Sequence, residues 1–276
     1  MSRHQLVMTM TGLATAAVVC AAAAGCVATG PENPSFDLSV SEAQAELSAM
    51  AEDPVELERP VLVLAGLFDP GFASRHLARA LRAATGDDRI IPVSFLFLPT
   101  FDACRQHAID MAREHFGDGG ELPEVDVVGV SMGGIVARYA AMPGEDGERL
   151  PVARLFTLGT PHQGASMAVL PAFTSKQRDM RADSQFLREL NEALEEADYG
   201  LYPYVRLGDR MVGTANAAPE GQHSYWVPHR YGRFAHMLVF RDARIKADIA
   251  RRLRGEEPYS GEPEPLPERW RRKGSS

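Results

Sequence analysis

The amino-acid sequence predicts an α/β fold, with a mostly parallel central sheet and helices on both of its faces. Short, continuous apolar segments, which are typical of strands buried on both faces, alternate along the chain with segments of helical periodicity. Such alternation is typical of a parallel sheet covered by helices. The composition of the 276 residues, 45% hydrophobic and 24% charged, is that of an ordinary globular protein.

The individual elements follow from the pattern in order. The first predicted strand, 60–66, is a continuous apolar run that ends in glycine. Further strands are predicted at 90–98, 125–130, 152–158, 202–207 and 224–227. Helices are predicted at 41–50, 72–84, 102–116, 132–142, 184–197 and 241–253. In the first of these helices, Ser41 and Gln44 have the spacing of a capping box.

These elements define one folded domain over residues 55–254. Residues 26–54 precede it and are expected to form a tether followed by the short helix 41–50. Residues 255–276 are rich in Pro and Glu and end in a basic cluster, so we expect this tail to be disordered.

Residues 1–25 have the features of an export signal. A short basic start and an apolar stretch lead to the small residues 23–25, which stand directly before Cys26. This arrangement resembles a bacterial lipobox, in which the cysteine receives lipid and becomes the new N-terminus. The resemblance implies an exported protein of the bacterial cell envelope, held in a membrane by lipid on Cys26. The alternatives are an ordinary signal for a secreted or periplasmic protein, and an uncleaved anchor long enough to span a bilayer.

Charge and cysteine content exclude several classes of protein. The formal net charge of −8 disfavours a nucleic-acid-binding protein, which would normally present a basic face. Three cysteines are too few for a disulfide-dense scaffold. Cys104 is expected to be an apolar residue on a helix. The sequence contains no zinc-type cluster of Cys and His, and no metal site is expected.

One motif carries chemistry. Residues 129–133 read Gly-Val-Ser-Met-Gly, directly after a predicted strand and directly before a predicted helix. In that context the glycines permit a sharp turn that lifts the hydroxyl of Ser131 out of the sheet. The start of the following helix supplies backbone donors for a developing oxyanion. The alternative is a tight turn without chemistry.

Four further segments lie in a fixed order around this motif: 64–67, 158–164, 186–191, and 208–212 together with 235–236. With them, the chain resembles an α/β-hydrolase of the bacterial lipase/esterase type over nearly the whole folded region. Five matches in order are far more specific than the serine motif alone.

The resemblance implies a role for each candidate residue, because in this superfamily the triad comes in the order serine, acid, histidine. Ser131 is then the nucleophile, Asp209 the acid and His236 the base. The backbone N–H groups of Leu67 and Met132 are expected to form the oxyanion hole.

Other histidines compete for the role of base. His229 and His223 flank the last short strand and are the alternatives to His236. His162 comes too early in the triad order, and we expect it to support the wall of the site.

The predicted function is hydrolysis of carboxylic esters, of lipids or of other acyl compounds, through an acyl-enzyme on Ser131. This chemistry requires no metal or organic cofactor. The expected partners are an ester or lipid substrate and, through Cys26, a membrane; no nucleic acid and no obligate protein partner are expected. The alternatives are an acyltransferase that uses the same triad and a catalytically inactive hydrolase-fold binding module.

Overall fold

The computed structural model describes residues 31–119, 121–166, 174–229 and 234–271. The predicted signal peptide, Cys26 and the first part of the tether lie outside these ranges. Within them, every helix is too short or too polar to cross a bilayer. All elements described below belong to the unit Asn33–Ser276.

The core of the fold is a six-stranded sheet in the order β2-β1-β3-β4-β5-β6, and each neighbouring pair is parallel. The strands are β1 (Val61–Leu64), β2 (Ile90–Val93), β3 (Val125–Val130), β4 (Val152–Leu158), β5 (Gly200–Arg206) and β6 (Tyr225–Val227). The predicted α/β class with a parallel sheet is therefore confirmed. Because all six strands run in one direction, the loops that follow them gather at one edge of the sheet.

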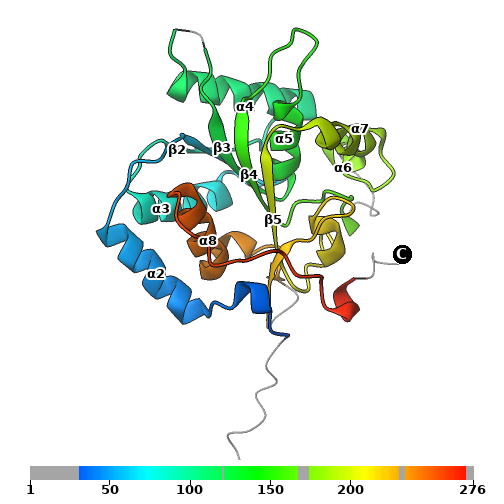
Figure 1. Ribbon diagram of the computed structural model, residues 1–276. Helices are drawn as coiled ribbons and strands as arrows, with labels where there is room; N and C mark the ends of the chain where they lie inside the picture. The colour runs from blue at the N-terminus through cyan, green and yellow to red at the C-terminus, as the bar shows by residue number, and fades with distance from the viewer. Residues whose placement is uncertain (1–30, 120, 167–173, 230–233, 272–276) are drawn as a thin grey trace, which may run out of the picture. The chain divides into compact units, whose positions relative to one another are not determined.

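Helices cover both faces of the sheet, as predicted (Figure 1). One face carries α2 (Val40–Glu52), α3 (Phe72–Thr85) and α8 (Ala243–Leu253). The other face carries α4 (Phe101–Phe116), α5 (Met132–Ala141) and α7 (Gln185–Ala193). A short helix, α6 (Ser175–Asp179), precedes α7 and was not expected from the sequence.

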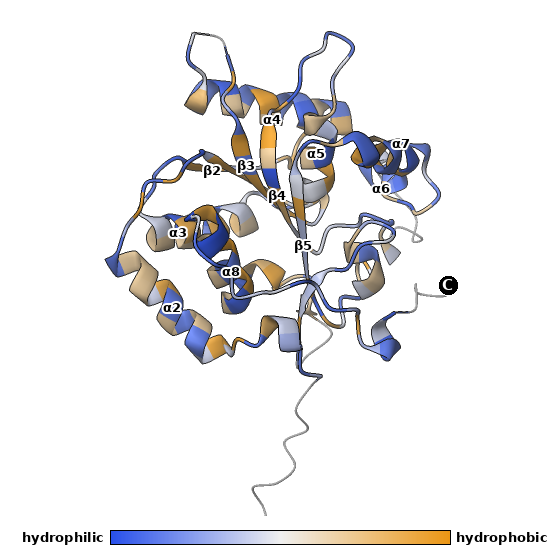
Figure 2. Ribbon diagram, in the orientation of Figure 1, coloured by the Kyte–Doolittle hydropathy of each residue, from blue (hydrophilic) through white to orange (hydrophobic). Residues whose placement is uncertain are grey.

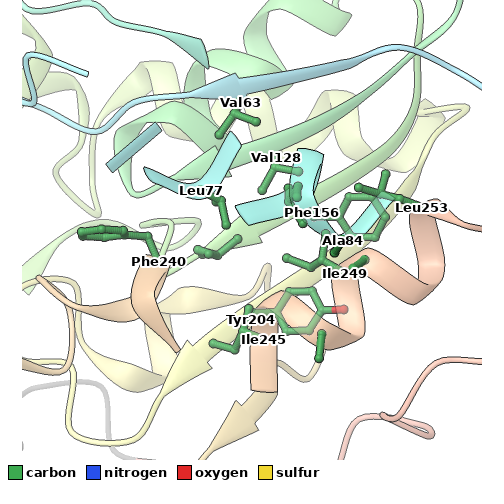
Figure 3. Close-up of a cluster of buried hydrophobic side chains, with 14 of the residues drawn as sticks. Val63, Leu77, Ala84, Val128, Phe156, Tyr204, Phe240, Ile245, Ile249 and Leu253 are labelled. Atoms are coloured by element: carbon green, nitrogen blue, oxygen red, sulfur yellow. The ribbon is translucent and has the colours of Figure 1, made fainter. Parts of the chain in front are cut away.

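The strands supply both cores because successive side chains point to opposite faces. In β1, Val61 and Val63 join the core beneath α3 and α8, whereas Leu62 and Leu64 join the core beneath α4 and α5. Figure 3 shows the first of these cores, which extends from Val63 to the side chains of α8. The hydropathy colouring marks the central strands as strongly apolar (Figure 2).

The boundaries of the second strand and of the first helix are among those that differ from the sequence prediction. The strand predicted over 90–98 ends at Val93, because its pairing partner Leu64 is the last residue of β1 and no strand continues beside it. The first helix begins earlier than predicted, with its capping box formed by Ser39 and Glu42. The carboxylate of Glu42 accepts the N–H of Ser39, and a negative charge is favoured at a helix start.

Residues 255–271 pack on the domain, whereas the sequence predicted a disordered tail over 255–276. The N–H and hydroxyl of Ser260 both donate to the buried carboxylate of Asp248 in α8, at 2.7 Å each. Farther along, the carbonyl of Glu264 accepts the indole N–H of Trp226 in β6 at 3.0 Å. Leu266 and Trp270 pack against the small core around Trp226. Composition suggested disorder, but a few specific contacts order this segment.

Asp248 is the centre of the network that holds the tail, so its removal should destabilise the protein. Besides Ser260, its carboxylate accepts the hydroxyl of Tyr204 at 2.6 Å and pairs with Arg252 at 3.2 Å. We expect Asp248→Ala to lower the free energy of unfolding by about 3–5 kcal/mol, because it leaves a partly buried cation unpaired. Urea unfolding measures this change. The control is Asp198→Ala, which breaks an exposed pair with Arg149 and should cost less than about 1 kcal/mol. Equal losses in both variants would contradict the prediction.

Candidate active site

The site is built around a strained turn at Ser131, between β3 and α5. Ser131 has φ 53° and ψ −120°, a backbone conformation that residues with a side chain rarely adopt. The two motif glycines make the turn possible. A Cβ at Gly129 would lie 2.5 Å from the Cα of Gly134, and a Cβ at Gly133 would lie 2.4 Å from the carbonyl oxygen of Leu64. No side chain fits at either position.

Hydrogen bonds from the neighbouring strand end fix the backbone of this turn. The N–H of Ser131 donates to the carbonyl of Leu158 at 2.9 Å, and the hydroxyl of Thr160 donates to the carbonyl of Ser131 at 2.8 Å. A Cβ at Gly134 would lie 2.2 Å from that hydroxyl oxygen. The turn is therefore held on both sides of Ser131, and a third glycine, which the motif does not include, is needed beside it.

The structure brings Ser131, His236 and Asp209 together in one chain of hydrogen bonds. His236 Nε2 lies 3.0 Å from Ser131 Oγ, and His236 Nδ1 lies 2.7 Å from Asp209 Oδ2. A carboxylate only accepts hydrogen bonds, so Nδ1 carries the ring proton of the neutral imidazole. Nε2 is then free to accept the proton of the serine hydroxyl.

Asp209 is buried and held in place by the backbone that follows it. Its second oxygen, Oδ1, accepts the N–H groups of Met211 and Val212 at 3.0 Å each. Gly159, with φ 58°, lies against the pair from the other side. A Cβ there would be 3.2 Å from both Asp209 Oδ2 and His236 Nδ1. Gly159 comes directly after β4, within the segment 158–164, and its place beside the triad was not predicted.

The other histidines lie elsewhere. His162 is fully buried, with its Nε2 2.9 Å from Thr157 Oγ1 and its Nδ1 accepting from Arg138 at 3.1 Å. Burial, together with the charge of Arg138, holds the pKa of His162 well below its usual range. His229 faces Arg206, and His223 is exposed.

Arg138 is a residue that the sequence analysis missed. It is 1% exposed, although it lies on α5, only seven residues beyond Ser131. Besides His162, its guanidinium donates to the carbonyl of Leu190 and to the side chain of Asn191, both in α7. Arg138 therefore joins the helix behind the serine, the loop after β4 and α7.

A cavity of about 360 Å³ opens beside Ser131 and His236. Its lining is mostly apolar and includes Leu67, Phe68, Met180, Met211, Met237 and Phe240. Apolar cavities with a few converging polar groups are typical of small-molecule sites. Among the described residues, no group of three or more His, Cys, Asp or Glu side chains is arranged to hold a metal ion.

One predicted oxyanion donor, Leu67, lines this cavity, and the other, Met132, directly follows Ser131. Leu67 follows β1 in a tight turn, in which the N–H of Asp69 donates to the carbonyl of Gly66 at 3.3 Å and Phe68 has a φ of 59°. Met132 is the first residue of α5, where a helix leaves backbone N–H groups without internal partners. Gly66 packs closely on the serine, since a Cβ there would lie 3.4 Å from Ser131 Cβ.

Neutral, buried His162 should make stability depend on pH. In the unfolded chain a histidine binds a proton below about pH 6.5, whereas in the folded protein His162 stays neutral to a much lower pH. The unfolded state thus gains protons as the pH falls, and folding is weakened. Between pH 7.5 and 5.5 we expect His162 to account for a loss of about 1 kcal/mol in the free energy of unfolding. Denaturant unfolding of wild type and His162→Gln at both pH values measures it; an equal pH dependence in the two proteins would contradict it.

A known family profile is similar to part of the chain. A family profile described as "PGAP1-like alpha/beta domain" matches residues 106–196. This range includes the turn at Ser131 and the loop after β4. A search of curated proteins gives no match.

Solved structures resemble the chain at low identity. The product of the gene lin2722 from Listeria innocua has 13% identity and a TM-score of 0.50, over 72% of this chain and 93% of that one. The lipase BlEst2 from Bacillus licheniformis, in its propeptide form, has 15% identity and a TM-score of 0.49, over 67% of this chain and 49% of that one. Phospholipase PlaB from Legionella pneumophila has 14% identity and a TM-score of 0.45, over 54% of this chain and 37% of that one. The chain thus spans less than half the length of the last two proteins. At 13% identity the likeness to the Listeria innocua protein concerns the fold alone, and it agrees with an α/β fold in which helices cover both faces of a six-stranded parallel sheet.

Proposed function

We propose that the protein is a serine hydrolase that cleaves carboxylic esters through an acyl-enzyme on Ser131. The observation that carries this proposal is the hydrogen-bonded sequence from Ser131 Oγ through His236 to buried Asp209, at the wall of an apolar cavity. A serine hydroxyl is a poor nucleophile by itself and needs an adjacent base that is oriented by a third group.

The proposed mechanism uses each of these groups in turn. His236 Nε2 accepts the proton of Ser131 as the serine oxygen attacks the ester carbonyl, and Asp209 stabilises the imidazolium that forms. The N–H groups of Leu67 and Met132 donate to the oxyanion of the tetrahedral intermediate. The imidazolium then protonates the leaving alcohol. Water, activated by the same histidine, cleaves the acyl-enzyme and restores the hydroxyl of Ser131.

The cavity favours an apolar acyl group. Its volume of about 360 Å³ and the methionines 180, 211 and 237 in its lining suit a flexible hydrocarbon chain, because methionine side chains adapt to irregular shapes. Lipid esters and other acyl esters are therefore the proposed substrates. A series of 4-nitrophenyl esters of increasing chain length would define the acyl group that fits best.

An acyltransferase would use the same acyl-enzyme with an alcohol in place of water. Product analysis with and without an added alcohol acceptor separates the two reactions: free acid alone indicates hydrolysis, and a new ester indicates transfer. An inactive binding module would need no proton-transfer chain, and the bonds to His236 weigh against it.

Substitution of the proposed triad tests the mechanism. We expect Ser131→Ala to abolish labelling by a fluorophosphonate probe and to lower kcat by about 10⁴–10⁶, because the members of a triad act as a unit. His236→Ala should cost about as much. The control is His223→Ala, which removes an exposed histidine and should cost about tenfold or less. Esterase activity retained by pure Ser131→Ala, or a dead His223→Ala, would refute these assignments.

We also propose that the protein is exported and carries lipid at Cys26, as its lipobox-like residues 23–26 suggest. One acyl chain alone binds a membrane only marginally, so stable attachment needs the several chains of a bacterial lipoprotein. The expected result is an N-terminal peptide that begins with acylated Cys26, detected by mass spectrometry of wild-type protein from membranes. An intact Met1 or a free N-terminus at another residue would contradict lipidation. Cys26→Ser should lack the acyl mass and keep its activity in detergent.

A further inference from the structure

A group of basic side chains lies on the face formed by α3 and the start of α8. We define this basic cluster as His76, Arg79, Arg241 and Lys246. His76 and Arg79 are on α3, Arg241 ends a short 3₁₀ turn that packs on α3, and Lys246 is in the first turns of α8. Burial lowers the pKa of His76, and the nearby positive charges of Lys246, Arg241 and Arg79 lower it further. A concentrated positive charge stands out in a chain of net charge −8.

The basic cluster adjoins the cavity at one of its lining residues, Phe240. Phe240 forms part of the cavity lining, and the rings of His76 and Phe72 lie 5.4 and 5.9 Å from its ring. The guanidinium of Arg241 lies over both phenylalanine rings, 5.7 Å from the centre of Phe240 and 5.4 Å from that of Phe72. Figure 3 places Phe240 at the margin of the core, beyond Leu77. A ligand that reaches from Ser131 past Phe240 therefore arrives at Arg241.

The charge of the basic cluster is poorly neutralised. Within the described residues, Arg79 and Arg241 have no carboxylate within 4 Å, and both are exposed. The one nearby carboxylate that acts on Lys246 is Asp242, which already pairs with Arg206 at 3.1 Å and with Arg244 at 2.8 Å.

Asp69 lines the cavity, and its carboxylate already accepts hydrogen bonds from the protein. Its carboxylate accepts the N–H groups of Phe72 and Ala73 at the start of α3, at 2.6 and 3.0 Å. Arg241, which lies over Phe240 of the cavity lining, and Arg79 on the neighbouring helix α3 are therefore two exposed guanidinium groups without acidic partners. Guanidinium groups are suited to phosphate because their planar donors match its oxygens.

We propose that the basic cluster binds the phosphate group of an anionic ester substrate whose ester carbonyl lies at Ser131. The inference rests on the proposed ester hydrolysis and specifies its substrate class. An ester held at Ser131 extends in two directions from its carbonyl. The apolar cavity receives the acyl chain, and the alcohol part runs past Phe240 to place its phosphate at Arg241 and Arg79.

A matched pair of soluble substrates tests this subsite. Glycerol monobutyrate and butyryl-glycerol 3-phosphate carry the same acyl group and differ by one phosphate. At low salt we expect wild type to show a kcat/KM at least tenfold higher for the phosphorylated ester. Arg241→Gln should lower that value about fivefold to tenfold and leave the neutral ester within twofold. Raising the salt concentration should reduce the preference in wild type, since exposed charges are screened.

The control variant is Arg269→Gln. Arg269 is also exposed and also lies over an aromatic ring, 4.9 Å from the centre of Trp270, but Trp270, unlike Phe240, is not part of the cavity lining. Its substitution should leave the kcat/KM of both esters unchanged. Equal values for the two esters in wild type would overturn the proposal. So would an Arg241→Gln variant that loses the same factor on both, because that result indicates a structural effect.

Measurements of ester binding distinguish failure of the proposed subsite from failure of the proposed ester hydrolysis. If wild type hydrolyses neither ester and takes up no fluorophosphonate, ester hydrolysis is refuted. The subsite is still tested by calorimetry on Ser131→Ala, whose Kd for the phosphorylated ester should be at least fivefold lower than for the neutral one. A third experiment measures binding to vesicles of phosphatidylglycerol. If wild type shows no preference between the soluble esters and Arg241→Gln weakens only vesicle binding, the subsite is refuted. The basic cluster is then a surface that faces the membrane.

Discussion

The close approach of backbone around Ser131 is the constraint on which the rest of the site depends. Three layers meet there: the end of β3, the start of α5 and the loops that follow β1 and β4. Each contact leaves too little space for a Cβ, at Gly129 and Gly133 within the motif and at Gly134 beside it. A residue with a positive φ costs about 1–3 kcal/mol, so the surrounding hydrogen bonds must enforce it. The energy that holds the hydroxyl in place thus comes from the sheet and its neighbouring loops, not from the serine itself.

Behind this turn, a buried cation is surrounded by neutral hydrogen-bond acceptors. Arg138 donates to the imidazole of His162, to a backbone carbonyl and to an amide side chain. Burial lowers the pKa of the guanidinium, but arginine stays charged at any physiological pH. A carboxylate here would pull the cation toward one partner. The guanidinium on α5 instead donates to several weaker acceptors, which belong to the loop after β4 and to α7. These hydrogen bonds fix the positions of the three elements relative to one another.

The sequence predicts the features that are marked by short stretches of neighbouring residues, and it predicts poorly those that depend on contacts between distant residues. The strands, the motif at 129–133 and the residues Asp209 and His236 stand at recognisable places along the chain, and the structure brings those side chains together. Features that depend on distant contacts were not predictable. Arg138 looks like an ordinary helix-surface arginine, and its burial follows only from the packing of α7. The composition of the tail was misleading. Its richness in Pro and Glu suggests disorder and does not reveal that Ser260 hydrogen-bonds to the carboxylate of Asp248.

The contacts at the two edges of the sheet have a consequence for how separate molecules behave. An edge strand presents unpaired backbone groups to which another chain can add a strand, and natural proteins suppress this association by covering or shortening their edges. At β6, the side-chain amide of Asn33 donates to the carbonyl of Trp226, and the tail lies along the same residue through the carbonyl of Glu264. At the opposite edge, β2 is four residues long and contains Pro92, which lacks a donor. Asn33 and the tail thus cover part of the edge at β6 from two sides. Loss of the tail by proteolysis would uncover Trp226, an apolar residue on this edge, while leaving Ser131, Asp209 and His236 intact.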